Sequence, residues 1–132
     1  MTVFVDTSAL YAVLDRSDRN NSRAGGVWVR LVRESANILT TNYVVVETSA
    51  LLQHRLGVPA LRAFYEDMYP QLTLSWISEG QHTASVEAVL AAGRKRLSLV
   101  DCSSFQTMRQ CGVRVAFAFD DHFREQGFEV LP

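Results

Sequence analysis

The sequence opens with a short apolar run that ends at an acidic residue and passes directly into a helical pattern. Residues 2–6 predict a buried strand, and Thr7 and Ser8 precede the apolar face of a helix. Asp6 therefore stands where a buried strand ends and a helix begins. Burying a carboxylate without a partner costs free energy. This position requires that Asp6 caps the helix, binds a ligand, or does both.

The same alternation of strand and helix continues along the chain. Strand-like segments at residues 38–41, 72–76, 113–119 and 128–131 are separated by amphipathic helical segments. This order predicts right-handed crossovers and an α/β fold, with helices on both faces of a central parallel sheet. We expect a single domain over residues 1–132. Ligands of such folds bind beyond the carboxyl ends of the strands, where Asp6 and Asp120 are expected to lie.

The charge balance limits how the protein could bind a nucleic acid. The formal net charge is −1, which provides no overall attraction for a polyanion. Twelve of the 13 basic residues are arginines, which suit bidentate contacts to phosphate. The apolar runs are too short to cross a bilayer, and the N-terminus lacks the pattern of a signal peptide. We therefore expect a cytoplasmic protein without a membrane partner.

Four acidic residues stand out as a candidate metal site. Asp6, Asp101 and Asp120 each have an alternative interpretation as helix caps. Ser98 with Asp101 resembles a capping box, as does Ser78 with Gln81, and Asn42 is the expected cap of the helix that contains Glu47. Glu47 lies inside a predicted helix, away from both ends and among apolar neighbours, so capping does not explain it. The alternative for Glu47 is a salt bridge to an arginine. A ligand role accounts better for the four residues as a set.

Converging carboxylates repel one another, and a hard divalent cation removes that repulsion. Mg²⁺ and Mn²⁺ prefer oxygen ligands and often bind through a few carboxylates together with substrate phosphate. Such ions can activate water and stabilise the leaving oxygen of a phosphodiester. The three histidines, His54, His82 and His122, are scattered, and we expect surface or packing roles for them.

Four segments in order resemble the motifs of the PIN domain family, and the resemblance covers essentially the whole chain. They read VDTSAL at residues 5–10, TNYVVVE at residues 41–47, SLVDCSSF at residues 98–105 and FDDHF at residues 119–123. The chain length and the SLVDC motif look most like the VapC ribonuclease toxins of bacterial toxin–antitoxin pairs.

The resemblance implies a three-layer α/β/α sandwich and an Mg²⁺- or Mn²⁺-dependent endoribonuclease. It places Asp6, Glu47, Asp101 and Asp120 at the acidic positions of the family, with Asp6 and Asp101 as the expected direct ligands. Ser8 matches a position where the family often has a small polar residue near the metal. The resemblance also implies an RNA substrate, a homodimer, and a cognate antitoxin that blocks the site.

Two features near the last motif differ from the family pattern or leave the identity of the fourth acid undecided. Many relatives carry Thr or Ser two residues before the last acid, and this chain has Ala118, which removes a hydroxyl that could support the site. Asp121 could share or replace the role of Asp120, although we expect it to cap a helix or face solvent. The basic residues 94–96 could contact RNA phosphates, or could complement the dipole of the preceding helix.

Two other functions remain open from the sequence. Ala118 motivates a non-catalytic PIN-fold interaction module. An Asp after the first strand is also typical of phosphoacceptor receiver domains and aspartyl phosphatases. A receiver requires an acidic pair there and a Lys near the sheet, whereas the only Lys is Lys95. The phosphatase pattern requires a second Asp where Ser8 stands.

Overall fold

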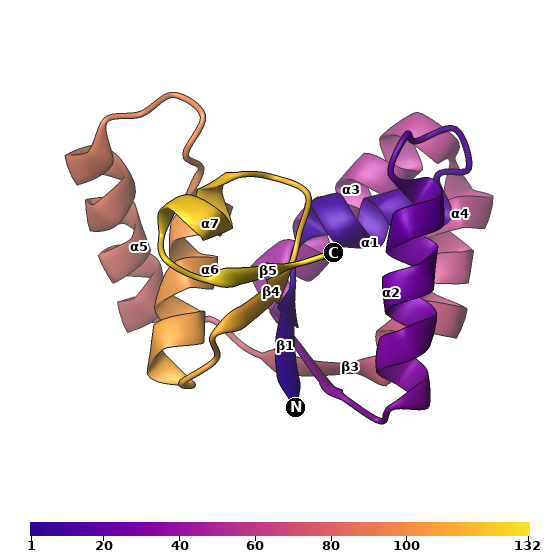
Figure 1. Cartoon of the computed structure of the whole chain (residues 1–132). Coiled ribbons are helices and arrows are strands. Elements are labelled where there is room, and N and C mark those ends of the chain that lie inside the picture. The colour runs from indigo at the N-terminus through magenta and orange to yellow at the C-terminus, as the bar shows by residue number, and fades with distance from the viewer.

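The computed structural model describes all residues, 1–132, and places a five-stranded sheet at the centre of the molecule (Figure 1). All neighbouring strands are parallel, and their order across the sheet is β3-β2-β1-β4-β5. The strands are β1 (Thr2–Val5), β2 (Asn37–Thr41), β3 (Leu72–Ser75), β4 (Val115–Phe117) and β5 (Glu129–Leu131). The predicted α/β fold with a central parallel sheet is confirmed.

Helices cover both sides of the strands and complete the three-layer α/β/α sandwich. In Figure 1, α5 and α6 lie on one side, α1, α2 and α4 lie on the other, and α3 contacts α1, α4 and α6. The helices are α1 (Thr7–Leu14), α2 (Asn21–Arg33), α3 (Asn42–Leu56), α4 (Val58–Ala63), α5 (Glu79–Ala92), α6 (Leu99–Gln110) and α7 (His122–Glu125). A π-helical turn (Phe64–Met68) and a 3-10 turn (Tyr69–Gln71) connect α4 to β3.

The central strand is apolar because both of its faces are covered. Val3, Phe4 and Val5 of β1 are completely buried, as expected for a parallel strand between two helical layers. The ring of Phe4 packs near that of Phe123 from α7, with centroids 6.1 Å apart. This packing fixes the carboxyl end of β1, and with it the position of Asp6.

One predicted strand is shorter than expected. The sequence pattern predicts a strand over residues 113–119 ending directly at Asp120, but β4 ends at Phe117. The partner strand β5 ends at Leu131, whose carbonyl accepts the amide of Ala118. The next amide, that of Phe119, donates to the side chain of Ser8 and not to a strand. Asp120 therefore lies in a loop beyond the sheet.

The cap of α3 also differs from the prediction. Asn42 was the expected cap, but the hydroxyl of Thr41 accepts the amide of Val44 and caps the helix. Asn42 is engaged elsewhere, since its side-chain oxygen accepts the amide of Ile77 at 2.7 Å. The capping boxes predicted at Ser78 and Ser98 are both present.

The strand order also bears on the alternative folds. Receiver domains have the order 2-1-3-4-5, whereas this sheet has the order β3-β2-β1-β4-β5. The receiver interpretation is therefore wrong. None of the helices is both long enough and apolar enough to cross a membrane.

Candidate metal centre

Asp6 is a buried carboxylate that also caps a helix. It is 4% exposed and occupies the N-cap position of α1. One oxygen, Oδ2, accepts both the amide of Ser8 at 3.1 Å and its hydroxyl at 2.6 Å. The other oxygen makes no hydrogen bond. Asp6 therefore does cap the helix, but only one of its two carboxylate oxygens takes part.

Burial raises the pKa of Asp6 to about 7. Loss of solvation is the largest cause, and the negative charges of Asp120 and Asp101 act in the same direction. The hydrogen bonds from Ser8 oppose the increase without cancelling it. Near neutral pH this carboxylate therefore stands in an environment that favours either a proton or a bound cation.

Ser8 connects the loops that follow β1 and β4. Its hydroxyl donates to Asp6 and accepts the amide of Phe119 at 2.9 Å. These two hydrogen bonds, to Asp6 and from Phe119, fix the orientation of the Ser8 hydroxyl. A small polar residue at this position fixes the orientation of Asp6 and holds the segment that leads to Asp120.

Asp101 lies in the first turn of α6 and is 8% exposed. Its Oδ2 accepts the amide of Ser98 at 2.9 Å, and its own amide donates to the Ser98 hydroxyl at 3.1 Å. This reciprocal capping box fixes the side-chain rotamer. As in Asp6, one carboxylate oxygen is held by a backbone amide and the other makes no hydrogen bond.

Asp120 and Asp121 have different environments. Asp120 is half-buried, its Oδ1 accepts the amide of His122 at 2.8 Å, and its second oxygen makes no hydrogen bond. Its pKa is raised, mainly by desolvation and also by the charge of Asp101. Asp121 is exposed and pairs with Arg124 at 3.7 Å. Only Asp120 has its carboxylate near the other acids.

Glu47 is more exposed than the sequence pattern predicts, although the apolar residues Val46, Leu99 and Val100 line the same pocket. The helical face that carries it is open to solvent, since both Glu47 and its neighbour Val46 are exposed, the latter to 66%. Desolvation by the protein atoms around its head group nevertheless raises the pKa of Glu47, and the charges of Asp101 and Asp120 add to this effect. Glu47 therefore lies at the rim of the acidic cluster.

The structure brings the four acids together from separate parts of the chain. Asp101 and Asp120 influence both Asp6 and Glu47 electrostatically. Three of the carboxylates present one oxygen to a backbone amide and leave the other free. This donor set of oxygens, in which the pKa values of Asp6, Glu47 and Asp120 are raised, fits a hard divalent cation.

The structure places His122 beside the acids, whereas the sequence predicted only a surface or packing role for it. Its ring, Asp101 and Asp120 each offer one ligand atom, and these atoms lie within 4.8 Å of one another. The ring also contacts the carbonyl of Arg96 through Nε2 at 3.1 Å. The available signal was its position two residues after Asp120, where the start of a helix turns the ring back toward the cluster.

Comparison with known proteins identifies close relatives of the chain. The sequence model of the PIN domain matches residues 3–129. The 23S rRNA-specific endonuclease VapC20 of Mycobacterium tuberculosis, found in strains CDC 1551 / Oshkosh and ATCC 25618 / H37Rv, is 32% identical over 137 aligned positions. These positions cover 98% of this chain and 98% of the relative.

Solved structures agree with this match. The crystal structure of M. tuberculosis VapC20, described as a sarcin–ricin loop cleaving toxin, superposes with a TM-score of 0.86 at 30% identity. It covers 98% of this chain and 99% of the other. FitAcB from Neisseria gonorrhoeae has a TM-score of 0.69 at 14% identity, over 100% of this chain and 97% of its own, and supports the fold alone.

Proposed function

Because the chain belongs to the PIN domain family, we propose that it is an endoribonuclease of the VapC toxin kind that hydrolyses RNA phosphodiester bonds with Mg²⁺ or Mn²⁺. The relative at 32% identity is named a 23S rRNA-specific endonuclease and is described as a toxin. A ribosomal RNA substrate would place the action of this protein in the cytoplasm.

One observation supports the metal centre above all others. Asp6, Asp101 and Asp120 each hold one oxygen on a backbone amide and leave the second free. Fixed rotamers with a free oxygen are the arrangement that a metal ligand requires. When bound, Mg²⁺ or Mn²⁺ would polarise the phosphodiester and activate water.

The protein residues have separate roles in this proposal. Asp6 and Asp101 are direct ligands, and Asp120 and Glu47 complete the set directly or through water. Ser8 positions Asp6, and Ser98 positions Asp101. The raised pKa of Asp6 means that a cation competes with a proton for this carboxylate, so metal binding should weaken as the pH falls below about 7.

We also propose that the protein forms a homodimer and is blocked by a cognate antitoxin. Large apolar side chains are exposed on α3, α5 and the segment after β3, including Val46, Trp76 and Leu90. Single apolar side chains are ordinary on protein surfaces, so the dimer is proposed from the family membership of the chain. Light scattering should give about twice the chain mass of 14.8 kDa. Co-expression with the product of a short adjacent reading frame should yield an inactive complex.

Cleavage of RNA tests the enzyme activity directly. A labelled sarcin–ricin RNA hairpin and total ribosomal RNA are incubated with the protein in Mn²⁺ or Mg²⁺, with and without EDTA. We expect discrete cuts that EDTA and Asp101→Asn abolish. Cleavage that persists in EDTA or in Asp101→Asn would contradict the metal mechanism.

The alternative is a non-catalytic PIN-fold module, and Ala118 is the observation behind it. Ala118 is buried and contributes only its backbone amide, which bonds Leu131. The Ser8 hydroxyl is already present beside Asp6, so the cluster is not without hydroxyl support. Absence of Mn²⁺ binding in calorimetry at millimolar metal would favour this alternative.

A further inference from the structure

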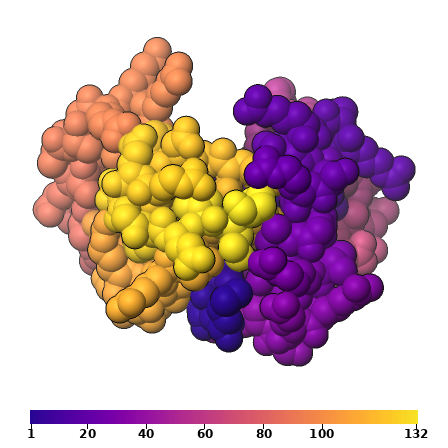
Figure 2. Space-filling view, viewed as in Figure 1, coloured from indigo at the N-terminus to yellow at the C-terminus, as the bar shows by residue number.

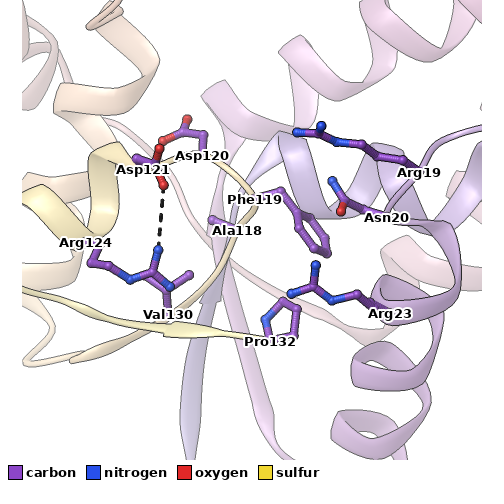
Figure 3. Close-up of a pocket in the computed structure, with 10 residues that line it drawn as sticks. All are labelled: Arg19, Asn20, Arg23, Ala118, Phe119, Asp120, Asp121, Arg124, Val130 and Pro132. Atoms are coloured by element: carbon purple, nitrogen blue, oxygen red, sulfur yellow. Dashed lines mark ion pairs between the residues drawn. The ribbon is translucent and has the colours of Figure 1, made fainter.

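A polar pocket lies next to the acidic cluster and shares one residue with it. The pocket has a volume of about 180 Å³ and lies between the start of α2 and the segment from β4 to α7 (Figure 3). Asp120 lines the pocket and also belongs to the acidic cluster. In the space-filling view a notch separates the C-terminal segment from α2 (Figure 2).

Three arginines line this pocket. Arg19 and Arg23 extend into it from the side of α2, and Arg124 approaches from α7 (Figure 3). Arg124 pairs with Asp121, whereas Arg19 and Arg23 form no ion pair with any residue of the chain. Two positive charges therefore face the pocket without a protein partner.

The positions of Arg19 and Arg23 do not stabilise α2. They lie just before and within its first turn, where the helix dipole disfavours cations, and this turn contains no acid. The guanidinium of Arg23 lies over the ring of Phe119, 5.7 Å from its centroid. Contact through the flat face leaves the N–H groups at the edge of the guanidinium free for an anion.

We propose that Arg19 and Arg23 form a subsite for a phosphate of the RNA strand next to the one that is cleaved. This inference rests on the proposed ribonuclease function. A phosphodiester held at the acidic cluster must continue on both sides, and the pocket is continuous with the cluster through Asp120. The fork of an arginine guanidinium matches phosphate geometry, and Arg124, which pairs with Asp121, lines the side of the pocket formed by α7.

RNA binding by matched variants tests this subsite. A fluorescein-labelled sarcin–ricin RNA hairpin is titrated in EDTA, where no cleavage should occur, against protein with an intact acidic cluster, by fluorescence anisotropy. The double variant Arg19→Ala, Arg23→Ala is compared with Arg30→Ala, Arg33→Ala, which removes the same charge from the last turn of the same helix. A contact to phosphate does not depend on base sequence, so the identity of the natural target does not affect the comparison.

We expect the Arg19 and Arg23 double variant to lose about tenfold or more in affinity and to lower the slope of log K against log salt by about 1 to 2. The control should change affinity by less than about threefold. The double variant Arg19→Lys, Arg23→Lys should lie between, since it keeps charge and loses the bidentate fork. In the cleaving protein, the alanine variant should raise KM more than it lowers kcat.

Two results would overturn the subsite. One is unchanged RNA affinity in the Arg19 and Arg23 double variant, and this result together with lost binding of the antitoxin would assign the arginines to a protein partner. The other is an equal loss of affinity in the control, which would indicate an effect of net charge alone. Failure of the ribonuclease proposal is distinguishable, since the unmodified protein would then cleave no RNA at any metal concentration.

Discussion

Asp6 combines a structural and a proposed catalytic role in a single carboxylate. Its Oδ2 caps α1 through Ser8, and its second oxygen is free to bind metal. The position could be predicted from the sequence, because an apolar strand that ends in an acid before a helix is a simple pattern. The degree of burial and the shared hydroxyl of Ser8 could not, since both depend on how the loop after β4 packs.

The raised pKa of Asp6 predicts a pH-dependent stability in the absence of metal. Its value rises from 3.8 to about 7 on folding, so the folded protein retains a proton that the unfolded chain releases. The free energy of unfolding therefore falls as the pH increases from about 4 to 7. In EDTA at pH 8, Asp6→Asn, which keeps a capping oxygen, should be more stable by about 1 to 4 kcal/mol.

Thermal unfolding of this variant at pH 4 and pH 8 measures the effect. The stabilisation should be largely lost near pH 4, where Asp6 is protonated in the folded state and about half protonated in the unfolded chain. Asp67→Asn, which changes an exposed acid without a hydrogen bond, serves as the control. It should change the unfolding midpoint at neither pH. A lower midpoint for Asp6→Asn at pH 8 would contradict the unfavourable burial of the charge.

Substitution of the neighbouring acids should separate their roles. Asp120 lies with Asp101 and His122, whereas Asp121 faces solvent beside Arg124. Asp120→Asn should lower kcat by about 100-fold or more, because it removes an oxygen that contacts the charged centre. Asp121→Asn should stay within about threefold in the same cleavage assay. Equal losses of kcat in Asp120→Asn and Asp121→Asn would show that both acids take part in the site.

At the scale of elements, the sequence pattern predicted which helices and strands form, and in what order, better than it predicted the residues at which they end. The capping boxes of α5 and α6 were predicted correctly because they depend on residues three positions apart. The end of β4 was missed because it depends on Ser8. The hydroxyl of Ser8 accepts a hydrogen bond from the amide of Phe119, 111 positions away in sequence. The exposure of Glu47 was missed because apolar neighbours in sequence do not reveal which face of α3 stays uncovered.

The capping box of α6 should support both the helix and the proposed site. Ser98→Ala and Ser78→Ala each remove an equivalent cap and should each lower the free energy of unfolding by about 1 kcal/mol. Only Ser98→Ala should also weaken Mn²⁺ binding, by about tenfold, because Ser98 orients Asp101. Calorimetric titration and chemical unfolding measure the two effects. Equal metal affinity in both variants would show that the box is structural alone.

At the scale of the whole molecule, the sheet collects residues that are distant in sequence. Asp6 follows β1, Asp120 lies beyond β4, and Glu47 and Asp101 lie on α3 and α6, which contact each other. The strand order places β1 between β2 and β4, so these segments converge at one edge. The PIN resemblance predicted this convergence, while the arginine pocket required the three-dimensional arrangement of α2 and α7.

A bound cation should stabilise the whole fold, because the acids that it neutralises repel one another. At 100 times the dissociation constant, Mn²⁺ should add about 2.7 kcal/mol to the free energy of unfolding. Thermal unfolding in Mn²⁺ and in EDTA measures the shift for the unmodified protein and for Asp101→Asn. The variant should show little shift, and an equal shift in both would place the ion elsewhere.

Anomalous scattering from a crystal soaked in Mn²⁺ is the sharpest test of the proposed metal centre, because it locates the ion without reference to activity. We expect a strong peak within coordination distance of the free oxygens of Asp6, Asp101 and Asp120, and no such peak in Asp101→Asn. A peak away from these carboxylates, or none at saturating Mn²⁺, would contradict the proposed metal centre.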